Sequence, residues 1–288
     1  MIFVVDGTGD EDTETYAKEM ADGFCRRLVR KASGRYWRGP TLSGWGTTDI
    51  ADDVVAAVVK WRKVAVDSEK LFLAGHSRGG AAVIFAAKSL KAHGIEIEAM
   101  FLFDAVDRTF NIRSANAIPD NVRHCFHALR DPSLAVYYSD GVKAARDRVA
   151  NCIGLPTGRR TSIMDDRIDQ LLTSPPVPGK CSHVIEEARL LIEQDNKMKI
   201  VMRSTTFSCR EGVSINFGNC GVQAEGQCKL KKQYFLGSHG ALGGAPIVDE
   251  RAPKLLVDSD RAAMVDVDVW MSAYMCQFNV FNAGKIRD

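Results

Sequence analysis

Short apolar runs alternate with longer amphipathic segments along the first half of the chain. Runs such as IFVV at 2–5 and MFLF at 100–103 end at an aspartate, which is typical of buried strands that lead into turns. The segments between the runs place apolar residues on one face at helical spacing. We expect strands at 2–5, 70–76, 97–104 and 122–129, and helices at 14–32, 50–66 and 78–92, with Asp49 as a cap of the second helix. This alternation predicts an α/β fold, a mostly parallel sheet with helices on both faces.

The second half of the chain is less regular. The segment 132–198 is long and mixed, and SPPVPG at 174–179 breaks it. We interpret it as a helical and loop insertion, a cap region within one domain spanning 1–288, and 205–231 as a second insertion rich in Cys and Gly. Further elements are expected as a helix at 183–195, strands near 199–207 and 232–237, and a last helix near 264–276.

The motif Gly75-His76-Ser77-Arg78-Gly79 lies between a predicted strand and a predicted helix. This G-x-S-x-G pattern in this context predicts a nucleophile elbow, a tight turn that exposes the serine in a strained backbone conformation. Side chains two residues before and two residues after the serine would collide, and glycines avoid that. The alternative is a structural turn with a capping serine.

A serine nucleophile needs a base and an orienting acid, in this fold class in the chain order serine, acid, histidine. His239 is the strongest candidate base, because it follows a strand-like run and lies among glycines in YFLGSHGALGG. Asp104 ends a predicted strand at the carboxyl edge of the sheet and is the preferred acid. Asp131, which ends the next strand in HALRDP, is the alternative acid.

The five other histidines are weaker candidates. His76 is adjacent to the serine, His93 is expected as a helix cap, and core or surface roles are expected for His124 and His127. His183 stands at the start of a predicted helix.

The oxyanion hole of such an enzyme uses the backbone N–H of the residue after the nucleophile, here Arg78. A second donor is expected from a loop at the same edge of the sheet. Gly7 and Thr8, in the turn after the first strand, are the candidates, and a plain turn glycine is the alternative for Gly7.

Composition and net charge exclude some classes of function. The chain has 288 residues, of which 45% are hydrophobic, and a net charge of +2, so it can form a large core and has no basic footprint for nucleic acid. The first ten residues reach Asp6 with no basic segment or long apolar run, so we expect a cytoplasmic protein or one exported without a cleavable signal peptide.

The eight cysteines form no C-x-x-C pair, so a zinc site or a thioredoxin-like motif is not expected. No metal and no cofactor are expected for the reaction. Cys209, Cys220 and Cys228 fall within one Gly-rich stretch. We expect buried thiols there, with a local disulfide as the alternative for a protein that works outside the cytosol.

These motifs together resemble a known family, the uncharacterised α/β-hydrolase domain family that includes type VI secretion phospholipase (lipase) effectors. FVVDGTGD resembles its opening strand and Asp-Gly-Thr turn, and LFLAGHSRGG its Gly-Phe-Ser-Arg-Gly-Ala elbow. FLFDAV resembles its strand ending in Asp-Thr-Val, VRHCFHALRD its His-Ala-Leu-Ala-Leu-Asp strand, and KQYFLGSHGALGG its Trp-Phe-x-Gly-x-His-Ser-Asp-Val-Gly-Gly segment. The resemblance implies an α/β-hydrolase-like fold with Ser77 as nucleophile, Asp104 as acid and His239 as base.

The resemblance also implies an ester or phospholipid substrate, contact with a membrane surface, and a secretion-system or immunity partner. The chain departs from the family pattern at His76, which replaces Phe, at Gly80, which replaces Ala, and at Gly240-Ala241, which replace Ser-Asp.

The sequence therefore predicts a serine hydrolase that cleaves carboxylic esters, preferably lipid or phospholipid acyl esters, through an acyl-enzyme. The alternative hypothesis is a catalytically inactive protein of the same fold that binds a partner or a lipid. That alternative predicts side chains that do not converge at Ser77.

Overall fold

The computed structural model describes residues 1–32, 34–41, 46–107, 115–131, 143, 145–156, 161–173, 179, 181–190, 219–246 and 254–282. A six-stranded sheet with the order β2-β1-β3-β4-β6-β8 is the centre of the molecule, and every neighbouring pair in it is parallel. Its strands are β1 (Ile2–Val5), β2 (Arg35–Trp37), β3 (Phe72–His76), β4 (Ile97–Phe103), β6 (Val122–Arg130) and β8 (Lys229–Phe235). A small second sheet pairs β5 (Ala117–Ile118) with β7 (Gln223–Ala224).

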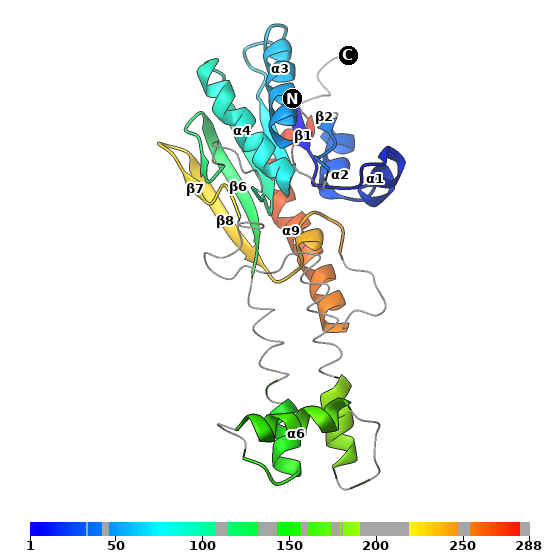
Figure 1. Cartoon of the computed structure of the whole chain (residues 1–288). Helices are drawn as coiled ribbons and strands as arrows, with labels where there is room; N and C mark the ends of the chain where they lie inside the picture. The colour runs from blue at the N-terminus through cyan, green and yellow to red at the C-terminus, as the bar shows by residue number, and fades with distance from the viewer. Residues whose placement is uncertain are drawn as a thin grey trace.

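Both faces of the main sheet are covered by helices, which confirms the predicted fold class. On one face α3 (Thr47–Arg62) and α4 (Arg78–Ala92) lie side by side (Figure 1) and pack on alternate strand residues such as Phe3 and Leu73. On the other face α2 (Phe24–Ala32) and α9 (Lys254–Gln277) pack on the intervening residues such as Val4 and Phe101. Side chains of a strand point alternately to the two faces, so strands covered on both sides need apolar residues at nearly every position.

The predicted helix at 14–32 is in fact two helices. α1 (Thr13–Glu19) has Asp12 as its N-cap, and α2 begins only at Phe24. Between them, the N–H of Phe24 donates to the carbonyl of Gly243. The break therefore places α2 against the loop that follows β8, a long-range contact that helical spacing cannot reveal.

One other boundary also differs from the prediction. The helix expected at 50–66 begins at Thr47 after an N-cap at Gly46, so Asp49 lies in its first turn and is not the cap. The described end of the segment 205–231 contains β7 and the start of β8, which add strands to two sheets. The strand expected near 199–207 lies outside the described residues.

Described helical residues of the segment 132–198 have a small core of their own. It contains Ala145, Val149, Ala150, Ile168 and Ala188, and involves α6 (Ser162–Thr173) and helical residues at 145–152 and 182–190. A disulfide joins Cys152 to Cys181, with their Cα atoms 5.9 Å apart.

The two described cysteines of the Gly-rich stretch are free thiols, as expected, and do not form the alternative local disulfide. Cys220 is a buried free thiol and Cys228 a half-buried one, whereas the disulfide joins two cysteines that the sequence pattern did not single out. Cys209 lies outside the described residues.

None of the helices that the structure describes is long and apolar enough to cross a membrane.

Candidate active site

Ser77 lies in the turn between β3 and α4 and has φ 55° and ψ −128°. A side-chain-bearing residue rarely adopts a positive φ, and such strain persists only where surrounding contacts enforce it. Here the N–H of Ser77 donates to the carbonyl of Phe103 at 3.1 Å, and its own carbonyl accepts from Gly80 and Val106 at 3.0 and 2.9 Å. The turn is therefore fixed by bonds to its own helix and to the end of β4.

The two glycines of the motif leave no room for side chains. A Cβ atom on Gly75 would lie 2.5 Å from the carbonyl oxygen of Gly79, and one on Gly79 would lie 2.3 Å from the carbonyl oxygen of Asp6. Real Cβ atoms do not approach that closely. Residues two before and two after the serine thus face each other, as the motif predicts.

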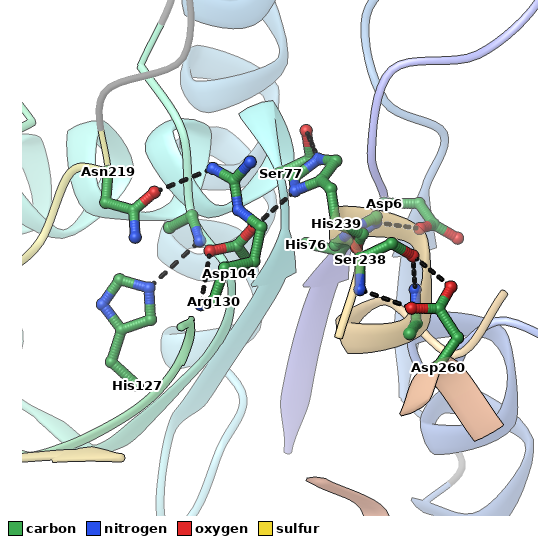
Figure 2. Close-up of polar contacts among 12 residues, drawn as sticks. Asp6, His76, Ser77, Asp104, His127, Arg130, Asn219, Ser238, His239 and Asp260 are labelled. Atoms are coloured by element: carbon green, nitrogen blue, oxygen red, sulfur yellow. Dashed lines mark hydrogen bonds and ion pairs between the residues drawn. The ribbon is translucent and has the colours of Figure 1, made fainter. Parts of the chain in front are cut away.

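Three side chains from distant parts of the chain form one continuous set of contacts (Figure 2). Nε2 of His239 lies 2.7 Å from Oγ of Ser77, and Nδ1 of the same ring lies 2.6 Å from Oδ2 of Asp104. Asp104 follows β4, and His239 is the first residue of the short helix α8 (His239–Leu242). Asp104 is fully buried, and the His239 side chain is 14% exposed. The structure thus brings together the serine, acid and histidine that the sequence singles out.

The carboxylate of Asp104 is held in its ionised form. Its Oδ2 forms an ion pair with Nε of Arg130, and its Oδ1 accepts from the Arg130 backbone N–H at 3.3 Å. Burial raises the pKa of Asp104, but the Arg130 guanidinium and the bond from His239 outweigh it and lower that pKa to about 2. Asp104 is therefore an acceptor for both nitrogen donors.

His239 is neutral in this environment. Burial lowers its pKa to about 4, although the bond to Asp104 acts in the opposite direction. Because the Asp104 carboxylate can only accept, the ring proton is assigned to Nδ1, which leaves the lone pair of Nε2 for the hydroxyl of Ser77. A base in this state can take the proton of that hydroxyl.

Two further contacts fix the loop that carries His239. Asp260 on α9 is fully buried and accepts from the N–H of Ser238 at 2.6 Å and from its hydroxyl at 2.5 Å. That hydroxyl in turn accepts from the N–H of Ala241 and caps α8. His76 lies below the same loop, with Nε2 3.2 Å from the carbonyl oxygen of His239.

The two predicted oxyanion-hole segments flank the serine. Arg78 is the first residue of α4, and its side chain donates to the carbonyl of Thr41 at 2.9 Å. Gly7 is close to the elbow, because a Cβ atom on it would lie 3.2 Å from Cβ of Ser77. The N–H of Gly7 donates to Oδ1 of Asp6 at 2.8 Å, so this N–H already has an acceptor in the structure.

The remaining candidates lie elsewhere. Asp131 directly follows β6, and its N–H donates to the carbonyl of Phe235, whereas the acid on Nδ1 of His239 is Asp104. His127 is fully buried and joins the N–H of Ala105 to the carbonyl of Gly221.

The other histidines fit the predicted minor roles. His93 is the C-cap of α4, His124 stacks on Phe126, and His183 forms an ion pair with Glu187. Within the described ranges, no group of three or more His, Cys, Asp or Glu side chains could hold a metal ion.

Sequence reasoning did not identify Arg130, Asn219 or Asp260. The sequence does contain an indication of Arg130, because a charged residue at the end of the mostly apolar run CFHAL is unusual and lies at the carboxyl end of a predicted strand. Asp260 gave none, because it is one of several acidic residues along a helix whose contact with Ser238 depends on the tertiary fold.

No family model matches the sequence, and no curated protein matches it. Solved structures of similar fold include an esterase of Pyrobaculum calidifontis, at 11% identity and a TM-score of 0.31, covering 92% of this chain and 76% of the esterase. A hormone-sensitive lipase from a metagenome library has 12% identity and a TM-score of 0.34, with coverage of 94% and 75%. The NocB thioesterase domain, solved as a covalent complex with a fluorophosphonate nocardicin G analogue, has 16% identity, a TM-score of 0.28 and coverage of 91% and 93%.

The fold is α/β-hydrolase-like by its own parallel sheet order and its strand–serine–helix turn. Because the sequence identities to these structures are so low, the chemistry of the site has to be inferred from the geometry of the site itself.

Proposed function

We propose that the protein is a serine hydrolase that cleaves carboxylic esters. The observation that carries the proposal is the set of contacts from Ser77 through His239 to Asp104, at 2.7 and 2.6 Å, on a serine in a strained turn. These are the contacts by which an acid and a base activate a serine hydroxyl.

The steps follow from the positions of these groups. Oγ of Ser77 attacks the acyl carbonyl while Nε2 of His239 takes its proton, and Asp104 keeps the imidazole in the right tautomer. The backbone N–H of Arg78, at the start of α4, stabilises the oxyanion together with a donor from the Gly7-Thr8 turn. His239 then protonates the leaving alkoxide, and water releases the acyl group from Ser77.

We further propose lipid or phospholipid acyl esters as the preferred substrates. The support is the resemblance of the motifs around Ser77 and His239 to those of the type VI secretion phospholipase effectors. Delivery by such a secretion system, contact with a membrane surface and an immunity partner are parts of the same proposal. Of the departures from the family pattern, His76 contacts the base, because its ring centroid lies 4.8 Å from that of His239, and Gly240 directly follows His239 in the sequence.

The alternative of an inactive binding protein is less well supported. It predicts side chains that do not converge at Ser77, yet His239 contacts Ser77 directly and Asp104 contacts His239.

The test is hydrolysis of p-nitrophenyl esters of increasing acyl length and of phospholipid vesicles. Wild type should hydrolyse them, with rates that rise with acyl length, and Ser77→Ala should lose the activity. Ser68→Ala, at an exposed position, is the matched control and should behave as wild type. Equal activity in Ser77→Ala would exclude the mechanism, and a preference for short soluble esters would exclude the lipid substrate.

A further inference from the structure

Arg130 is a buried cation in direct contact with the acid of the triad. Its side chain is 1% exposed, and its Nε forms an ion pair with Oδ2 of Asp104, the same oxygen that Nδ1 of His239 approaches to 2.6 Å. Figure 2 shows Arg130 and His239 on either side of this carboxylate. The arginine therefore shares one acceptor atom with the histidine that acts as base.

The guanidinium is itself held in place. Its Nη2 donates to Oδ1 of Asn219 at 3.0 Å, and Asn219 forms a bridge with Val106, two residues after Asp104. The backbone N–H of Arg130 donates to Oδ1 of Asp104, so one residue holds both carboxylate oxygens.

Stability alone does not account for such a pair. A buried ion pair gains little net free energy, because removing two charges from water costs about as much as their attraction returns. Asp104 has φ 45°, a strained conformation for a residue with a side chain, so the direction of its carboxylate depends on its partners.

We propose that Arg130 is a positioning residue of the triad, which fixes the Asp104 carboxylate toward His239 and offsets its negative charge. This proposal rests on the proposed function of the site. A triad acid ordinarily stabilises the protonated histidine. Here a positive charge on the same oxygen weakens that effect and keeps His239 neutral in more acidic solution.

Among the described titratable groups near His239 and Asp104, Arg130 alone carries a permanent positive charge. The described groups near His239 or Asp104 are Ser77 and His76 at the β3–α4 turn, Arg130 and His127 on β6, and Cys220 beside β4. Burial lowers the pKa of His127 to about 4 and raises that of the Cys220 thiol, so both are uncharged near neutral pH. Arg130 is the one among them that is charged at every pH of interest.

The decisive experiment compares wild type, Arg130→Met and Arg130→Lys by the imidazole ¹⁵N resonances of His239, assigned by their loss in His239→Gln. The charge of a neighbour within about 4–6 Å shifts a pKa by roughly 1–3 units. Arg130→Met should therefore raise the pH at which the Asp104–His239 pair takes up its proton by about one unit or more. Arg130→Lys, which keeps the charge, should restore the wild-type value.

Arg123→Met is the matched control, because Arg123 lies on the same strand but is 58% exposed and pairs with Glu96 and Glu98. It should titrate as wild type. A folded Arg130→Met whose His239 titrates as wild type would overturn the proposal. This titration needs no turnover, so a wild type that hydrolyses no ester would count against the proposed function and not against the role of Arg130.

If Arg130→Met does not fold, Asn219→Ala provides the test. It removes a hydrogen-bond acceptor of the guanidinium and leaves the charge of Arg130 in place. It should lower kcat for ester hydrolysis severalfold and leave KM unchanged, because Asn219 acts on the triad through Arg130. An unchanged kcat would overturn the proposal.

Discussion

Two residues of the site adopt a backbone conformation that few side chains tolerate. Of the described residues other than glycine, only Ser77, Asp104 and Asn279 have a positive φ. A residue held in such a conformation costs of order 1–3 kcal/mol, and at Ser77 and Asp104 bonds across the sheet enforce it. These bonds run from the N–H of Ser77 to the carbonyl of Phe103 and from the N–H of Asp104 to that of Ala128. The strain orients both side chains toward the carboxyl edge of the sheet, where His239 meets them.

The choice of acid can be tested at single residues. Asp104→Asn should lower kcat by about 10⁴-fold, because an amide at this position favours the wrong tautomer of the histidine. Asp131→Asn should retain wild-type activity, since Asp104 and not Asp131 contacts Nδ1 of His239. Ester-hydrolysis kinetics on both variants, with circular dichroism to confirm folding, provide the measurement. Loss of activity in the Asp131 variant alone would reverse the assignment.

The protonation of His239 predicts the pH dependence of the reaction. The reaction needs the neutral ring, and burial lowers its pKa from the usual 6.5 to about 4. A lowered pKa means that the base stays neutral as the solution becomes more acidic. The acidic limb of kcat/KM, which reports this group in the free enzyme, should therefore lie well below pH 6.5. A limb at pH 6.5 or above would show that the histidine is not in the described environment.

Residue types at the elbow were predictable because steric limits dictate them. Only glycine fits at positions 75 and 79, where a Cβ atom would overlap backbone atoms. The preference for Asp104 and His239 followed from chain order and from the edge at which parallel strands end. Arg130 and Asn219 were not predicted, because their contacts join segments 89 residues apart in sequence.

At the scale of elements, the histidine loop depends on the long helix α9. Helix α8 has only four residues and cannot fix His239 by itself. Asp260, from the interior of α9, bonds both the N–H and the hydroxyl of Ser238. The orientation of His239 therefore depends on the packing of α9 against the sheet.

Asp260→Ala should weaken both folding and catalysis. It leaves the buried N–H of Ser238 without its acceptor, which costs about 1–3 kcal/mol in the free energy of unfolding. It should also lower kcat, because His239 loses its fixed position. Denaturant unfolding and ester kinetics measure the two effects, and Asp266→Ala on the exposed side of α9 is the control. Wild-type kcat in a destabilised Asp260→Ala would show that the loop is held by other contacts.

Element types were predictable in the first half of the chain, where the apolar spacing is regular. The helix expected at 78–92 is α4 with the same bounds, and β1 also matches its predicted range. The break between α1 and α2 was not predicted, since the acceptor for the N–H of Phe24 is Gly243, far along the chain. The three-residue strand β2 was not predicted, because it is too short to show alternation.

At the scale of the whole molecule, a hydrolase-like sheet carries a separate helical segment. The sheet has two apolar cores, one on each face, and the helical residues between 143 and 190 form a third. That third core has few members, and the disulfide between Cys152 and Cys181 links its helices across 29 positions of sequence. The sequence predicts that this segment is a cap over the site. Such a cap would affect the choice of substrate and not the contacts within the triad.

Reduction of this disulfide should destabilise the helical segment. Closing a loop of about 30 residues stabilises a fold by roughly 3–4 kcal/mol through the lost freedom of the unfolded chain. Alkylation followed by peptide mass mapping should detect Cys152 and Cys181 as thiols only after reduction, with a loss of thermal stability in the same sample. Alkylation of both residues in the oxidised protein would contradict the pairing.

The most direct test of the central claim is intact-mass measurement after treatment with a fluorophosphonate. A serine activated by His239 should give one covalent adduct on wild type, located at Ser77, and none on Ser77→Ala or on a folded His239→Gln treated for the same time. An adduct that persists on Ser77→Ala, or a folded wild type that stays unlabelled with and without detergent, would contradict an activated serine at this site.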